Sequence, residues 1–191
     1  MGGSTGASRC LCPQQEHHRI DLSAGGQGGQ APVMVINRPA ASFWGGISNV
    51  LFATDFSAAA DRAFNFAFDL VQELGCNFTC FMHWMSPGTR HAISIPRTDI
   101  DDRIREALQR LRVRYVSKMK GYAHYSAEVW EGIPFVEIVK YGREKQADLI
   151  VMAHSNRKDE SDDDVIGSVA EQVVLRANCP VITINQAAGK H

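Results

Sequence analysis

The feature that most constrains the fold is a regular alternation of short apolar runs with longer amphipathic segments from about residue 47 onward. An apolar run without polar alternation is typical of a strand buried on both faces, as in a parallel sheet. Five such strands alternating with four helices predict a doubly wound α/β domain with a mainly parallel sheet and helices on both faces. The predicted strands cover residues 49–54, 77–84, 124–130, 148–152 and 180–185.

Local signals predict where three of these elements begin or end. Ser57 is a suitable N-cap for a helix whose apolar residues fall on one face, and Gly75 supplies its stop. Pro134 stands where a later helix can start, because a proline in the first turn loses no helical hydrogen bond.

The chain divides into an N-terminal extension over residues 1–46, a folded domain over residues 47–186 and a short tail over residues 187–191. The extension is rich in Gly, Ser and Gln, so it has little apolar surface to offset the entropy of ordering, and we expect it to be flexible. Within it, Val33–Ile36 is an apolar island that either docks on a sheet edge or stays loose.

Charge and composition exclude several classes of protein. The 20 Lys and Arg residues nearly balance the 21 Asp and Glu residues, so we expect no nucleic-acid partner. No apolar stretch approaches the roughly 20 residues of a membrane span, so we expect no membrane partner. Five cysteines, an odd number, together with no apolar leader favour a cytoplasmic location. No metal-ligand spacing is evident, so no metal site is predicted.

A ligand site is expected at the carboxyl ends of the strands, where the strand order of a doubly wound sheet reverses. Ala53, Thr54 and Asp55 lie at the end of the first strand. The long segment after the fourth strand runs into Gly167 and Ser168 at a helix start, whose free N–H groups suit a phosphate.

Six sequence motifs in this order resemble those of the universal stress protein family. The resemblance covers residues 47–186 and implies a Rossmann-like fold of the adenine nucleotide alpha hydrolase type, with strand order 3-2-1-4-5. It also implies a homodimer joined through the last strand, Val181–Ile184, which would otherwise be an open sheet edge. The motifs are Asn49–Ser57, Phe81–His83, Gly132–Pro134, Ala147–Met152, Gly167–Glu171 and Cys179–Val181.

Many members of this family bind ATP through a loop that reads Gly, two residues, Gly, nine residues and then Gly-Ser or Gly-Thr. The resemblance assigns Asp55 to the adenosine half, and Gly167 and Ser168 to the phosphates. Ala153 and Asn156 replace the first two glycines, and ten residues rather than nine separate Asn156 from Gly167. A Cβ at these positions hinders positive φ and close approach to phosphate, so the site is degraded.

The loop also carries five acidic residues between positions 159 and 164, which repel phosphate unless Mg²⁺ or Mn²⁺ bridges them. Trp84 ends the second strand and either stacks on a base or fills the adenine pocket. The complete candidate set for nucleotide binding is Ala53, Thr54, Asp55, Trp84, Met152, Ala153, Asn156, Gly167, Ser168 and Val169.

The leading hypothesis is a stress-response binding and signalling protein with weakened ATP binding, supported by Mg²⁺ or Mn²⁺. One alternative is a dimeric scaffold that binds no nucleotide and recruits protein partners. Another is a weak nucleotide hydrolase. No catalytic constellation or P-loop lysine is evident, so a binding role is favoured over an enzyme and no catalytic residue is predicted.

Overall fold

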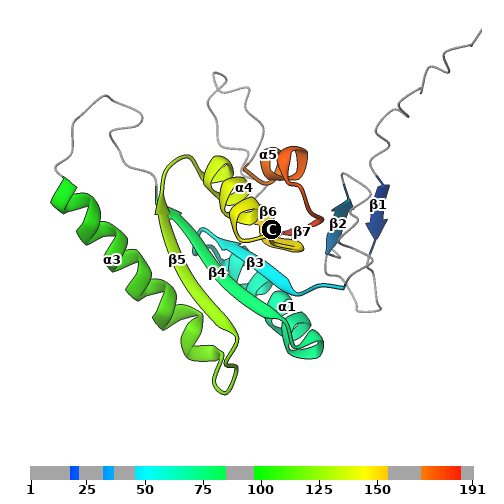
Figure 1. Cartoon of the computed structure of the whole chain (residues 1–191), viewed down its shortest axis with the longest axis horizontal. Coiled ribbons are helices and arrows are strands. Elements are labelled where there is room, and N and C mark those ends of the chain that lie inside the picture. Colours follow the sequence, from blue (N-terminus) through cyan, green and yellow to red (C-terminus); the bar gives the residue numbers. More distant parts are fainter. Residues whose placement is uncertain (1–17, 22–31, 37–45, 85–96, 155–168, 186–191) are drawn as a thin grey trace, which may run out of the picture.

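The computed structural model describes residues 18–21, 32–36, 46–84, 97–154 and 169–185 (Figure 1). Five adjacent parallel strands form one side of its sheet, in the order β5-β4-β3-β6-β7 and with β5 at the edge. This is the order predicted for the five strands, and the doubly wound α/β class is confirmed. The strands are β3 (Asn49–Thr54), β4 (Asn77–Trp84), β5 (Tyr125–Glu131), β6 (Leu149–His154) and β7 (Val181–Asn185).

Two further strands extend the sheet beyond β7, which gives seven strands in the described part of the chain. β2 (Val33–Ile36) pairs antiparallel with β7, and β1 (His18–Asp21) pairs antiparallel with β2. Val33–Ile36 thus docks on a sheet edge, one of the two outcomes left open for it, whereas the flexibility expected of the extension does not hold for His18–Asp21.

The pairing of β2 with β7 has a simple physical origin. The outer edge of β7 presents unpaired backbone groups, and the apolar sequence of β2 matches its register, with Met34 opposite Ile182. Met34 is only 8% exposed and joins the main hydrophobic cluster. The edge that was predicted to pair with a second copy, Val181–Ile184, is thus occupied by a strand of the same chain, and dimerisation itself stays a prediction.

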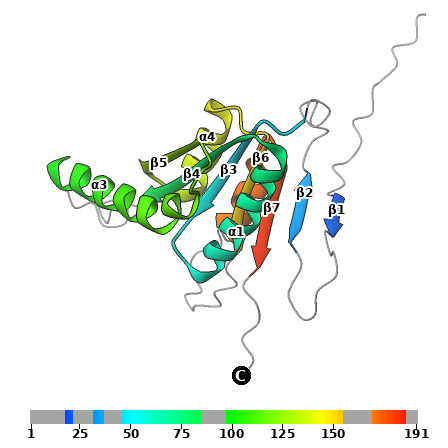
Figure 2. The ribbon, with the colours of Figure 1, turned by 90° about the horizontal axis from the view of Figure 1, so that it is seen from below.

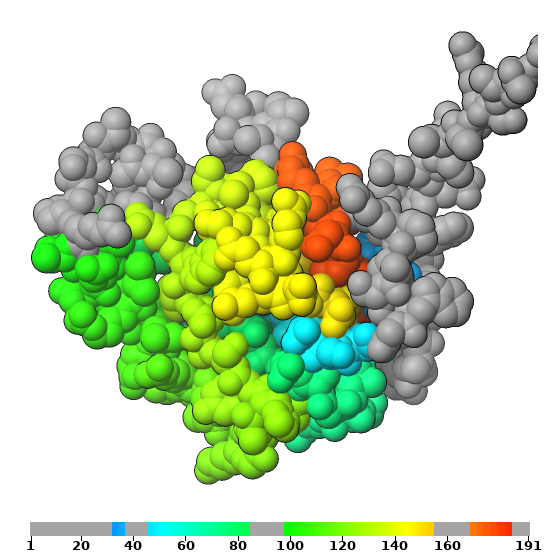
Figure 3. Space-filling model, viewed as in Figure 1, coloured from blue at the N-terminus to red at the C-terminus, as the bar shows by residue number. Residues whose placement is uncertain are grey.

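The helices cover both faces of the sheet, as predicted. α1 (Ala58–Leu74) and α3 (Arg97–Arg114), which leads into the short 3-10 helix η2 (Val116–Lys118), lie on one face. α4 (Pro134–Glu144) and α5 (Val169–Arg176) lie on the other. Figure 2 shows α1 and α3 on one side of the strands with α4 on the opposite side, and Figure 3 shows α4 and α5 packed side by side.

The predicted helix boundaries of α1 and α4 are confirmed. The Ser57 hydroxyl accepts a hydrogen bond from the Ala60 N–H at 3.1 Å. Gly75 ends α1 in the left-handed region, with φ +66°, where a side chain would add strain. Pro134 is the first residue of α4.

Each face of the sheet buries its own hydrophobic cluster, the α1/α3 cluster on one face and the α4/α5 cluster on the other. Aromatic rings dominate the first, where Phe52 meets Tyr115 edge-on with ring centroids 5.3 Å apart. Ile138 and Tyr141 of α4 lie in the second. Among the described helices, none is long and apolar enough to cross a membrane.

Candidate functional site

The carboxyl edge of β3 and β6 brings together two of the predicted site residues. Ala53 and Met152 are register partners on these adjacent parallel strands. Both are 5% exposed and belong to the α4/α5 cluster. This almost completely buried pair, just before the ends of the two strands, is the apolar floor of the carboxyl edge.

Thr54 has a structural role that the sequence did not indicate. It is buried on the opposite face, where its Oγ1 lies 3.0 Å from the hydroxyl oxygen of Tyr115. The same Oγ1 accepts the N–H of Phe56 at 3.0 Å. Burial raises the pKa of Tyr115 to about 12, so the phenol stays protonated at neutral pH. The Thr54 hydroxyl therefore fixes the turn that follows β3 and does not face the floor.

That turn presents the Asp55 carboxylate to solvent. Asp55 is exposed, and its Oδ1 accepts the N–H of Ser57 at 2.9 Å, which closes an Asx turn before α1. Phe56 adopts φ +61°, an uncommon conformation for a residue with a side chain. Its ring stacks on Tyr115 at 6.0 Å and lies 4.6 Å from the Arg110 guanidinium carbon. These contacts hold the backbone in the geometry that directs Asp55 outward.

His83 also lies at this edge, although it is not among the candidate residues predicted from the sequence. It lies near the end of β4, opposite Trp130 on β5. Burial lowers the pKa of His83, and the Asp55 carboxylate partly opposes that effect. The imidazole is therefore neutral at physiological pH. The sequence signal that could have identified His83 as a residue of this edge is its place next to the end of an apolar strand.

The remaining strand residues lie around the edge. Trp84 is half-buried at the end of β4, opposite Glu131. Strand alternation places it on the α1/α3 face, away from Ala53 and Met152. Ala153 pairs with Ile184 and packs against the α1/α3 cluster.

Val169 opens α5 and is exposed. Asn156, Gly167, Ser168 and the acidic run at 159–164 lie outside the described residues. The structure thus describes the half of the site assigned to adenosine, and leaves the half assigned to phosphate outside its description.

The described part of the edge carries groups that can contact a ligand. It offers an outward carboxylate, a neutral imidazole nearby and an apolar floor. Small-molecule sites usually combine an apolar surface with a few polar groups. Among the described side chains, no group of three or more His, Cys, Asp or Glu residues is placed to hold a metal ion.

The family model and the curated relative that match this chain carry the same family name. The model of the Universal stress protein family matches residues 46–185. A curated relative, Universal stress protein MJ0531 of Methanocaldococcus jannaschii, is 28% identical over 143 residues, which are 72% of this chain and 81% of the relative.

Two solved structures show the same fold. A universal stress protein in complex with cAMP is 18% identical and has a TM-score of 0.55, covering 74% of this chain and 99% of its own. The hypothetical protein MJ0577 is 19% identical, with a TM-score of 0.59, and covers 75% of this chain and 99% of its own. At these identities the likeness extends to the fold alone.

Proposed function

Because this chain belongs to the universal stress protein family, we propose that it is a stress-response binding protein that takes an adenine nucleotide at the carboxyl edge of β3 and β6. The observation that carries the proposal is the Asp55 carboxylate, held outward by an Asx turn beside the floor of Ala53 and Met152. This is the point where the strand order reverses, the usual ligand position in a doubly wound sheet.

The described residues fit the adenosine half of such a ligand. A carboxylate accepts hydrogen bonds from ribose hydroxyls, and an apolar floor suits a purine ring. The solved universal stress protein with cAMP supports an adenine nucleotide as the ligand class. For the phosphates, the sequence pattern proposes Gly167 and Ser168, with Mg²⁺ or Mn²⁺ to offset the acidic run.

We expect the affinity for ATP to be low, because Ala153 and Asn156 stand where the nucleotide-binding loop pattern has glycine. A backbone carrying Cβ atoms approaches phosphate less closely. Restoring both glycines, as Ala153→Gly with Asn156→Gly, should therefore strengthen binding. The matched control is Ala147→Gly, since Ala147 precedes β6 and lies away from this edge.

The test is titration calorimetry of ATP with Mg²⁺ against the full chain and three variants. Gly167→Val should abolish binding by placing a branched side chain at the proposed phosphate position. Asp55→Asn should weaken it, because the amide oxygen can still accept the Ser57 N–H while the negative charge is lost. Asp148→Asn is the matched control, since that carboxylate binds the N–H groups of Ser48 and Asn49 at the other end of the sheet.

Absence of heat with the wild-type chain at millimolar ATP would overturn the nucleotide proposal and favour the partner-recruiting scaffold. Binding that survives Gly167→Val would overturn the assignment of the site. Steady formation of ADP that Asp55→Ala or Ser168→Ala abolishes, with the fold intact, would instead support the weak hydrolase.

A further inference from the structure

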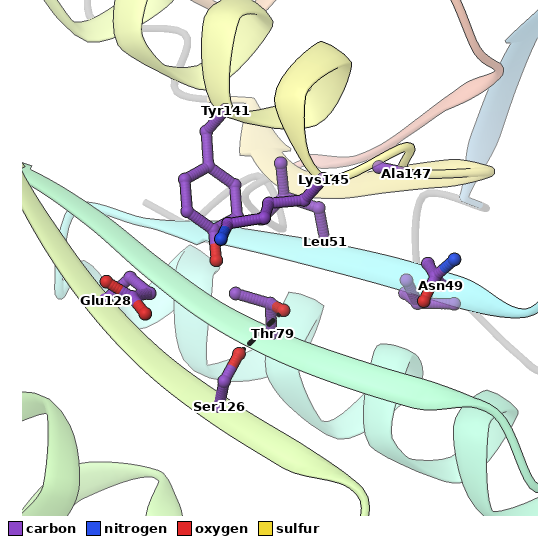
Figure 4. A pocket seen from close by; sticks show the side chains of 9 residues that line it. Asn49, Leu51, Thr79, Ser126, Glu128, Tyr141, Lys145 and Ala147 are labelled. Atoms are coloured by element: carbon purple, nitrogen blue, oxygen red, sulfur yellow. Dashed lines mark hydrogen bonds between the residues drawn. The ribbon is translucent and has the colours of Figure 1, made fainter.

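A separate hollow lies at the opposite end of the sheet from Asp55. Its volume is about 230 Å³, and it opens between the last turn of α4 and the first halves of β3, β4 and β5 (Figure 4). Because these strands are parallel, their first residues meet at one edge, far from the turn that follows β3. The residues lining this hollow are Asn49, Val50, Leu51, Thr79, Ser126, Glu128, Tyr141, Lys145 and Ala147.

Three hydroxyl groups gather in this hollow. The hydroxyls of Thr79 and Ser126, which are register partners on adjacent strands, lie 2.9 Å apart. The Tyr141 side chain points from α4 toward Thr79 (Figure 4), although the residue as a whole is only 2% exposed. Burial raises the pKa of Tyr141, so its hydroxyl keeps its proton and can donate it in a hydrogen bond.

Two opposite charges line the same hollow without neutralising each other. Glu128 reaches it from β5, and Lys145 reaches it from the end of α4. Within the described part of the chain, neither side chain forms an ion pair or hydrogen bond, although the Lys145 ammonium lies 5.8 Å from the centre of the Tyr141 ring. Elsewhere on α4, by contrast, Lys140 is 4.0 Å from Glu137.

We propose that this hollow binds a small zwitterion of the amino-acid class, with its ammonium group at Glu128 and its carboxylate at Lys145. A ligand with both charges pairs with both side chains, whereas a ligand with one charge pairs with one of them and leaves the other to water, since Lys145 is exposed and Glu128 is half-buried. The Thr79 and Ser126 hydroxyls hydrogen-bond each other and keep lone pairs that can accept the N–H groups of an amide-bearing side chain. Leu51 and Ala147 supply an apolar part of the lining. This site is independent of the nucleotide proposal.

The experiment is a titration of the full chain with L-glutamine, followed by backbone amide chemical shifts. Two matched analogues separate the charges: 4-aminobutanamide lacks the α-carboxylate, and glutaramate lacks the α-ammonium. Saturable shifts are expected at Thr79 and Ser126 with L-glutamine. Each analogue should bind at least about tenfold more weakly, since loss of one charged hydrogen bond costs about 1.5 kcal/mol or more.

Variants test the assignment of the two charges. Glu128→Gln and Lys145→Gln should each weaken L-glutamine binding about tenfold and leave the binding of the analogue that lacks the matching charge unchanged. Lys140→Gln, an exposed lysine of α4 that does not line the hollow, is the control. Shifts that do not saturate, equal binding of all three compounds, or variants that bind like the wild type would each overturn the proposal.

Discussion

Replacing Thr54 with valine removes a single oxygen from the buried end of β3 and keeps the shape of the side chain. That oxygen accepts the Phe56 N–H and contacts the Tyr115 hydroxyl, both at 3.0 Å. The Phe56 N–H would be left unpaired in a residue that is 8% exposed, and Tyr115 would lose one partner while keeping Asp61. One unpaired buried donor and one lost hydrogen bond together predict a loss of about 2–4 kcal/mol of unfolding free energy.

Urea denaturation measures this loss as a lower transition midpoint with an unchanged slope. Thr54→Ser is the matched control, because it keeps the oxygen and deletes one methyl group, at a cost of about 1 kcal/mol. If valine destabilises the protein no more than serine does, the hydroxyl does not hold the turn and the reasoning is refuted. We also expect Thr54→Val to loosen the Asx turn at Asp55 and so to lower any affinity for ATP.

Three further outcomes follow from the described contacts. The Arg114 guanidinium binds the Asp61 carboxylate through two hydrogen bonds and holds the pKa of Asp61 below its usual value. The pair therefore stabilises the fold at pH values above the usual pKa of an aspartate. This contribution is lost as the pH falls through the pKa that Asp61 has in the folded protein. Arg114→Gln should accordingly reduce the loss of stability between neutral pH and about pH 3 in urea titrations. Gly75→Ala should cost about 1 kcal/mol through its positive φ alone, and Gly75→Asn less; equal costs in thermal unfolding would contradict this. Met34→Asp should release β2 and open the edge Val181–Ile184 to a second copy; light scattering over a dilution series should show tighter self-association than the wild type, and equal association would refute it.

The five parallel strands could be predicted because each is marked by its own residues. The apolar run at 49–54 has no polar alternation, so it specifies burial on both faces wherever it packs. Ser57, Gly75 and Pro134 mark helix ends through hydrogen bonds and backbone angles that involve only their near neighbours in the chain. Such local signals need no knowledge of the rest of the fold.

The candidate site was only partly predictable, for a physical reason. Asp55 was identified because it follows a buried strand, but the contact of Thr54 with Tyr115 depends on a residue 61 positions away, between α3 and η2. The burial that makes His83 neutral likewise comes from packing across the sheet. The role of a strand residue depends on which helices cover the face of the sheet to which its side chain points.

The sequence by itself determined the alternation of strands and helices, the ends of several helices and the location of Asp55 at a strand terminus. These properties depend on local periodicity and on neighbours a few residues apart. Only the tertiary structure decided that β2 covers the edge of β7, and that Glu128 and Lys145 line one hollow. Both results join segments far apart in the chain, and such contacts are set by the assembled sheet rather than by any local pattern.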